Sequence, residues 1–184
     1  MRRFFVVPNP SLLLHPTLPK PLHGVNPRTI YGKTWWDKER EKTYSVAEYR
    51  CMACGVRKQD AKFRQWLEAH ECYNFYWEEG VATMSQVVAL CNFCHNAIHR
   101  NRLQSMVDDG VYSSKYQSAV LNHRSLILSS AGLPSEPDLP PEETWAPWRE
   151  WRLILDDGVP HYSPFMDERH WKAFYAEKNA KMLR

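Results

Sequence analysis

Two Cys-x-x-Cys pairs constrain the fold of this chain more than any other feature. Cys51 and Cys54 form the first pair, and Cys91 and Cys94 form the second after 36 intervening residues. Two thiolates at this spacing can bind one ion, and two such pairs supply the four ligands that zinc prefers in closed structural sites. A single pair is as readily a buried or redox-active couple, and two pairs can also form disulfides. The combination of both pairs favours a four-cysteine zinc site.

The composition indicates a globular protein without a membrane span. A chain of 184 residues is long enough for one domain with a core, or for a small module with long extensions. No apolar run approaches the roughly 20 residues that span a bilayer, and the apolar run over residues 4–7 ends at Pro8, too early for a signal peptide. We therefore expect a soluble, intracellular and cytoplasmic protein with no membrane partner, in a reducing compartment where thiolates stay available to metal.

The charge is distributed unevenly along the chain, although its net value is only +3. Residues 1–66 contain 13 Lys and Arg against 5 Asp and Glu, whereas residues 67–184 contain 11 against 16. A basic N-terminal third favours a polyanion partner, because each cation near a phosphate releases condensed counterions. A solvated, lysine-rich surface is the other interpretation of the same pattern.

The hydrophobic pattern predicts a mixture of helices and strands. Residues 1–30 hold six prolines, which predicts an extended arm, packed on the body through Leu12 to Leu14. The alternation over residues 66–72 and the apolar run over residues 81–90 predict two strands, joined by a connection that turns at Gly80. Helices are expected over residues 32–48, 92–106 and 113–130, the last with Tyr116, Val120, Leu121 and Leu128 inward.

The C-terminal third is interpreted as a structural extension that carries no chemistry of its own. A proline-rich linker is expected over residues 135–143. Residues 151–155, the turn at 156–158 and the returning residues 159–165 predict a hairpin. Asp167 is a candidate cap for a final helix.

Three histidines and a glutamate form the candidate reactive constellation. His95 and His99 lie four residues apart on a predicted helix, so that their rings project from one face. His70 and Glu71 lie on the strand upstream, and three imidazoles, or two with a carboxylate, can hold a divalent ion with open positions. Taken singly, His95 is as readily a fifth ligand or a hydrogen-bonding partner of the sulfur site, and His99 a core or surface histidine.

The residues around these histidines resemble a known family. Leu67-Glu68-Ala69-His70-Glu71, followed by Val88-Ala89-Leu90-Cys91-x-x-Cys94-His95-x-x-x-His99, is similar to the zinc-containing branch of the HNH endonucleases. That family has the ββα-metal, or His-Me finger, fold, and the similar segment covers about residues 51–103. The resemblance implies an α+β protein with a ββα-metal (HNH) core stapled by a four-cysteine zinc knuckle.

The resemblance also implies a role for each matching residue. Cys51, Cys54, Cys91 and Cys94 would hold a structural zinc ion, while His70, His95 and His99 would hold a catalytic divalent ion such as Mg²⁺ or Mn²⁺. The chain departs from the family at two positions. Glu71 replaces the histidine that activates water, and Gln86 stands at the position of the asparagine that orients this base. A carboxylate accepts a proton less readily than imidazole, since an unperturbed Glu has a pKa near ~4.3.

Basic residues flank both parts of the resembling segment. Lys58, Lys62 and Arg64 follow the first cysteine pair, and Arg100 and Arg102 follow His99. These side chains are candidates for contacts with nucleic-acid phosphates, which position a backbone rather than read its bases, and their other interpretation is solvated surface. We expect three parts: a basic arm with a helix over residues 1–48, an HNH-like core over residues 49–110, and a helical and hairpin extension over residues 111–184.

Two functions remain as alternatives. The first is a metal-dependent HNH-type endonuclease that hydrolyses DNA phosphodiester bonds, with Glu71 or another base activating water. The second is a catalytically silent HNH-fold zinc module that binds nucleic acid or other protein subunits through the N- and C-terminal extensions. The two departures at Glu71 and Gln86 motivate the second alternative, because both fall on the proton-transfer machinery and neither falls on a metal ligand.

Overall fold

The computed structural model describes residues 7–182, with side chains through Glu177, and these residues form two compact units. Unit 1 comprises residues 7–17, 37–72 and 87–138, whereas unit 2 comprises residues 18–36, 73–86 and 139–182. Residues 1–6, which include most of the apolar run before Pro8, lie outside the described range. The three-part division expected from the sequence stays a prediction.

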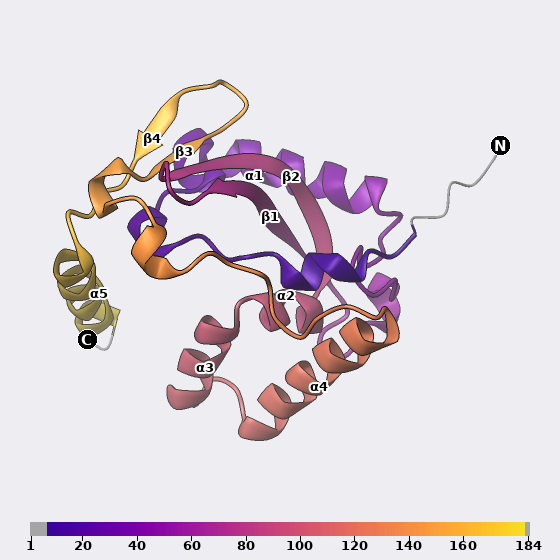
Figure 1. The fold of residues 1–184 in the computed structure, drawn as a ribbon. Coiled ribbons are helices and arrows are strands. Elements are labelled where there is room, and N and C mark those ends of the chain that lie inside the picture. Colours follow the sequence, from indigo (N-terminus) through magenta and orange to yellow (C-terminus); the bar gives the residue numbers. More distant parts are fainter. Residues whose placement is uncertain (1–6, 183–184) are drawn as a thin grey trace. The chain divides into compact units, whose positions relative to one another are not determined.

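The described chain has the predicted mixture of helices and strands, with five α-helices and one four-stranded sheet (Figure 1). The strands follow the order β1-β2-β3-β4 across the sheet. Within residues 7–182, no helix has both the length and the apolar character required to cross a bilayer. The strands are β1 (Leu67–Tyr76), β2 (Val81–Cys91), β3 (Arg152–Ile154) and β4 (Pro160–Tyr162), and the helices are α1 (Pro27–Val46), α2 (Asn92–Ile98), α3 (Arg100–Asp108), α4 (Ser114–Ser130) and α5 (Glu168–Met182). Short 3-10 turns are η1 (Pro10–Leu14), η2 (Lys20–Leu22), η3 (Lys58–Asp60), η4 (Glu142–Thr144) and η5 (Trp148–Glu150).

The hairpin of β1 and β2 continues from unit 1 into unit 2. The sequence correctly predicted both strands, but the predicted end of the first strand at Cys72 is wrong. β1 continues to Tyr76, although the burial pattern changes parity after Cys72, because the adjacent Tyr73 is also buried and Asn74 is exposed. The turn at Gly80 is confirmed.

Unit 2 holds the short strands and a core built on Trp151. Ala82 of β2 pairs in parallel with Leu153 of β3, which pairs in turn with His161 of β4 in antiparallel orientation. The predicted C-terminal hairpin is thereby confirmed. The predicted cap of the last helix is also confirmed, since Asp167 Oδ1 accepts a hydrogen bond of 2.7 Å from the backbone N–H of His170.

Unit 1 contains the cysteines and most of the predicted site. The single helix predicted over residues 92–106 is wrong, because the backbone at His99 leaves the helical region (φ −86°, ψ 52°) and separates α2 from α3. Helix α4 begins as predicted, capped by Ser113, and buries Tyr116, Val120 and Leu128. Leu121 was predicted inward but is 39% exposed, and Arg124 is buried instead. The buried positions repeat every four residues, which leaves Leu121 outside the stripe.

The N-terminal arm carries more local structure than the sequence predicted. It forms the turn η1, whose Leu12 and Leu13 are buried in the core of unit 1, as expected. η1 packs against α2 and α4 (Figure 1). The helical region α1 starts at Pro27, before the predicted start at Gly32, and Gly32 interrupts it with a positive φ of 82°.

Candidate metal centres

The four cysteines of the two pairs lie together in unit 1. Their sulfur atoms all lie within 4.8 Å of one another, and the Sγ atoms of Cys54 and Cys91 are 3.9 Å apart. Four sulfurs arranged tetrahedrally around zinc at about 2.3 Å would be about 3.8 Å from one another. The four cysteines can therefore hold a metal ion such as zinc, and none of the cysteines in the described range forms a disulfide.

Local backbone structure positions the sulfurs. Cys51 and Cys54 lie in a tight turn in which the N–H of Gly55 donates to the carbonyl of Cys51 over 2.8 Å. Gly55 adopts a positive φ of 77°, and a Cβ there would lie 2.7 Å from the Pro8 ring. The N–H of Met52 donates to the carbonyl of Ala89 over 2.8 Å, which joins the first turn to β2 just before the second cysteine pair.

The thiols influence one another strongly. Hydrogen bonds from Cys51, Cys91 and Cys94 lower the pKa of the Cys54 thiol, whereas hydrogen bonds with Cys51, Cys54 and Cys91 raise the pKa of Cys94. Closely packed sulfurs cannot all ionise without a neutralising cation. This is the electrostatic situation that a bound divalent ion resolves.

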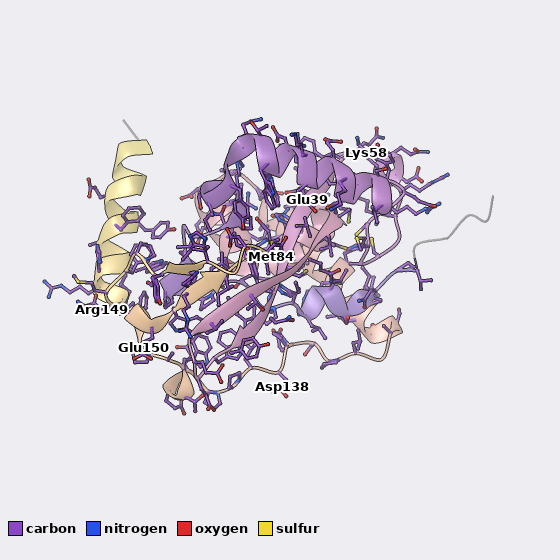
Figure 2. The ribbon with its side chains drawn as sticks, turned by 90° about the horizontal axis from the view of Figure 1, so that it is seen from above. Glu39, Lys58, Met84, Asp138, Arg149 and Glu150 are labelled. Atoms are coloured by element: carbon purple, nitrogen blue, oxygen red, sulfur yellow. The ribbon has the colours of Figure 1, made fainter. Side chains whose placement is uncertain are left out.

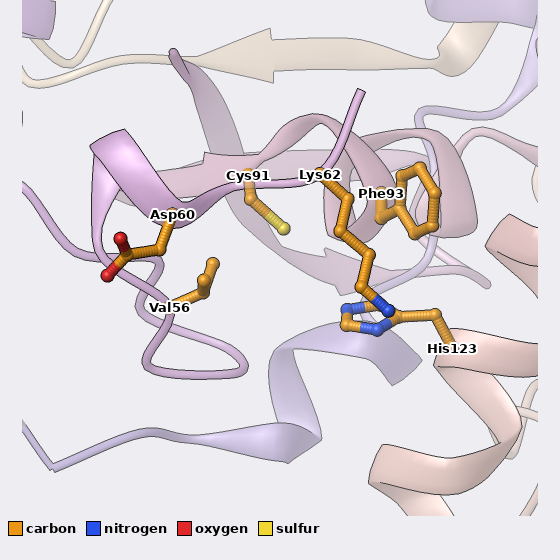
Figure 3. Close-up of a pocket in the computed structure, with 6 residues that line it drawn as sticks. All are labelled: Val56, Asp60, Lys62, Cys91, Phe93 and His123. Carbon is orange, nitrogen blue, oxygen red and sulfur yellow. The ribbon is translucent and has the colours of Figure 1, made fainter. Parts of the chain in front are cut away.

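His123 of α4 lies beside the sulfur cluster and was not singled out from the sequence. Its Nε2 atom lies 3.5 Å from the Sγ atom of Cys94, within hydrogen-bonding distance for sulfur. Figure 3 shows a small pocket here, in which the side chain of Lys62 extends toward the His123 ring. The pocket is lined by Val56, Asp60, Lys62, Cys91, Phe93 and His123. An imidazole N–H in this position can stabilise a thiolate.

The three predicted imidazoles also come together. One ring nitrogen from each of His70, His95 and His99 lies within 4.8 Å of the others, and His70 Nδ1 is 3.1 Å from His99 Nε2. β1 supplies His70, α2 supplies His95, and His99 occupies the break between α2 and α3. We call His70, His95 and His99 the imidazole cluster.

Glu68 is the carboxylate that contacts this cluster. Its Oε2 atom lies 2.9 Å from His95 Nδ1, and its Oε1 atom accepts a 2.7 Å hydrogen bond from Asn92 Nδ2. Tyr116 donates its hydroxyl hydrogen to Asn92 Oδ1, and Asn96 Nδ2 donates to the Tyr116 oxygen over 3.1 Å. A carboxylate against the second nitrogen of a histidine fixes the ring's orientation and raises its strength as a ligand.

Burial keeps two of the imidazoles neutral. It lowers the pKa of His70 well below its ordinary value and that of His99 to about 3, and the neighbouring His95 lowers both further. Burial raises the pKa of Glu68, but its contacts with His95 and Asn92 outweigh this effect and lower it to about 2. Metal binding requires imidazole ligands in their neutral form, which burial favours at His70 and His99.

A second group of potential ligands adjoins the cluster. His15, His70 and Cys72 each offer a ligand atom within 4.8 Å of the others, and the rings of His15 and His70 are 5.5 Å apart at 85°. Neither His15 nor Cys72 was predicted as a site residue. His15 belongs to no motif, so no sequence signal pointed to it. Cys72 lies two residues after His70 in the predicted strand, and this spacing places both side chains on one face.

The two predicted proton-transfer residues lie outside the groups of potential metal ligands among the described residues. Glu71 is half-buried on β1, and Gln86 is exposed on β2. Their roles stay predictions.

The predicted phosphate-contacting side chains are all exposed: Lys58, Lys62, Arg64, Arg100 and Arg102. Lys58 lies at the surface near the C-terminal end of α1 (Figure 2). The Arg64 guanidinium lies 4.4 Å from the Trp66 ring centre. Arg100 forms a two-pronged ion pair with Glu136, so that its charge is already compensated.

Comparisons of the chain with models of protein families, with curated proteins and with solved structures found no match.

Proposed function

We propose that this protein is a metal-dependent endonuclease of the HNH type that hydrolyses DNA phosphodiester bonds. The observation that carries the proposal is the imidazole cluster, in which three ring nitrogens lie within 4.8 Å of one another, together with a four-cysteine group in the same unit. Three imidazoles leave positions open on a divalent ion, as catalytic sites require, whereas four thiolates close a structural site.

The proposed role of each residue follows from its contacts. His70, His95 and His99 would hold the catalytic ion, and Glu68 would orient His95 through the 2.9 Å contact with its Nδ1. A divalent ion bound there would polarise the scissile phosphate and stabilise the leaving oxygen. The four cysteines would hold the structural zinc, which fixes the start of α2 and with it the direction of His95.

In this proposal Glu71 remains the base that activates water, and Gln86 orients it. Both roles rest only on the resemblance to the HNH endonucleases. Lys58, Lys62, Arg64 and Arg102 are proposed to contact the phosphate backbone of DNA, since their exposed cations can reach a ligand. Arg100 is the weakest member of the predicted set, because Glu136 already neutralises it.

The test is cleavage of supercoiled plasmid DNA by the purified, zinc-loaded protein in the presence of Mg²⁺ or Mn²⁺. We expect nicking or linearisation that His95→Ala and His99→Ala abolish while one zinc ion per chain is retained. His170→Ala is the matched control, because His170 is an exposed histidine of α5 in unit 2. Intact DNA with every divalent metal tried, or cleavage that survives His99→Ala, would overturn the proposal.

A silent zinc module is the second candidate. The observation that favours it is the exposed position of Gln86 together with the absence of Glu71 from the groups of potential ligands within residues 7–177. It predicts salt-sensitive association with nucleic acid or with another protein that survives His99→Ala and Glu71→Ala. Hydrolysis that depends on Glu71 would exclude this candidate.

A further inference from the structure

The N-terminal segment brings a fourth imidazole to the region of the imidazole cluster. His15 lies 55 residues before His70 in the sequence, yet the two rings are in edge-to-face contact with centres 5.5 Å apart. On the other side of His70 in the sequence, Cys72 lies two residues along β1, and alternate residues of a strand share one face. The potential ligand atoms of these three residues lie within 4.8 Å of one another.

We infer that His15, His70 and Cys72 form a second metal position, suited to a thiophilic divalent ion such as zinc, which competes with the imidazole cluster for His70. We call it the His15 position.

The backbone around His15 is held firmly, so that its approach to His70 is a feature of the fold. The N–H of Asn9 donates to the carbonyl of Met52 over 2.7 Å, and Leu12 and Leu13 are buried. The guanidinium of Arg124 donates to the carbonyl of Leu13 over 3.4 Å. Pro16 restricts His15 to extended backbone, and the observed ψ of 125° lies in that region.

The two ring nitrogens of His70 have different surroundings. Its Nδ1 atom lies 3.1 Å from His99 Nε2, within the imidazole cluster. Its Nε2 atom is buried and has no hydrogen-bond partner in the described part of the chain, and the side chain is only 3% exposed. A buried ring nitrogen without a partner is costly unless a ligand satisfies it.

The ligand types define the ion. Two imidazoles and a thiolate resemble the ligand sets of zinc sites with three protein ligands, and the sulfur favours zinc over Mg²⁺ or Mn²⁺. Cys72 is 2% exposed, so a bound ion rather than solvent would stabilise its thiolate.

Sharing His70 makes the two positions mutually exclusive. A neutral imidazole has one nitrogen with a lone pair and one with a hydrogen, so His70 can ligate only one ion at a time. Zinc at the His15 position would therefore lower the affinity of the imidazole cluster for its own ion. That consequence, an inhibitory zinc site, rests on the proposed function, whereas the metal position itself does not.

The test is a titration with Co²⁺ of protein that already holds one equivalent of zinc in the four-cysteine group. A thiolate bound to Co²⁺ gives a charge-transfer absorption band in the near ultraviolet, which imidazole and carboxylate ligands do not give. We expect the wild-type protein to show one further Co²⁺ ion with this band. Cys72→Ser should remove the band, and His15→Ala should weaken Co²⁺ binding at least tenfold.

His95→Ala is the matched control, because it removes an imidazole from the cluster and leaves the His15 position complete. Its band should remain. Far-ultraviolet circular dichroism and retention of one zinc ion check the fold of each variant, with Cys72→Ala as a second replacement at the same position. A band that is absent from the wild type, or that His95→Ala removes and His15→Ala leaves, overturns the inference. Failure of the proposed nuclease function would appear instead as intact plasmid and would leave the titration unchanged.

Discussion

At the scale of single residues, one face of β1 carries the chemistry. Glu68, His70 and Cys72 occupy alternate positions of this strand. Glu68 contacts His95, and His70 contacts His99. Cys72 lies in one group of potential ligands with His15 and His70. Glu71 has the opposite parity, which the alternation of a strand makes unavoidable. Glu68, which contacts His95 of the imidazole cluster, lies three residues before the glutamate that the resemblance singled out.

Replacing Glu68 by glutamine should weaken the imidazole cluster without removing a ligand. Gln has nearly the same shape, but the charge beside His95 Nδ1 is lost, and such changes next to a ligating histidine weaken metal binding by about 10–100-fold. The measurement is calorimetric titration of zinc-loaded protein with Mn²⁺. Glu71→Gln makes the same charge change on the other face of β1 and should leave the affinity unchanged. Equal losses in the two variants would contradict the role given to Glu68.

At the scale of elements, a break in helical geometry and a glycine turn end two of the elements around the site. His99 interrupts the helix after the second cysteine pair, and the N–H of Leu103 then donates to the His99 carbonyl over 2.8 Å to start α3. Gly80 turns β1 into β2 with a positive φ of 62°. A Cβ at Gly80 would lie 2.9 Å from the Ala146 methyl group and 3.1 Å from the backbone nitrogen of Trp151, so this turn packs directly against the core of unit 2.

Gly80→Ala should destabilise the protein more than Gly110→Ala. Both residues have a positive φ, 62° and 72°, but a Cβ at Gly110 meets no atom within 4 Å among the described residues. The backbone strain of about 1 kcal/mol is common to both variants, and overpacking adds about 1–3 kcal/mol at Gly80 alone. The measurement is urea denaturation followed by tryptophan fluorescence. Equal free energies of unfolding for the two variants would show that the turn has room for a methyl group.

At the scale of the whole molecule, two cores are built from interleaved segments. The core of unit 1 includes Cys51, Cys91 and Cys94 among its buried apolar residues, whereas the core of unit 2 contains no cysteine in the described range. The cysteines that could hold a metal ion are thus part of the packing of unit 1, and a bound ion would connect the turn at Cys51 to β2 and α2. Unit 2 depends on aromatic packing, with Trp77, Trp145 and Trp151 in mutual contact.

Removing zinc should unfold unit 1. Structural zinc contributes about 10–16 kcal/mol of apparent binding energy, which equals or exceeds the 5–15 kcal/mol that stabilises an ordinary domain. After treatment with a strong chelator, we expect hydrogen exchange to increase at least tenfold in α2 and α4, with recovery when zinc is returned. Mass spectrometry of peptides measures the exchange, and Cys72→Ala protein that retains zinc is the control. Native protection in a protein shown to be zinc-free would contradict a structural role for the four cysteines.

The sequence by itself determined what depends on near neighbours and on ligand chemistry. Alternation identified β1, and an apolar run identified β2. The spacing of the cysteines predicted their common site, and the four-residue spacing of His95 and His99 predicted that both rings lie on one side of the helix. Only the tertiary structure decided the approach of His15 to His70, the burial of Arg124 and the break in the helix at His99. Periodicity encodes the direction of a side chain within its own element, because backbone geometry repeats locally. Contacts between residues far apart in the chain arise from packing of complete elements, to which every buried side chain contributes, and no short motif records them.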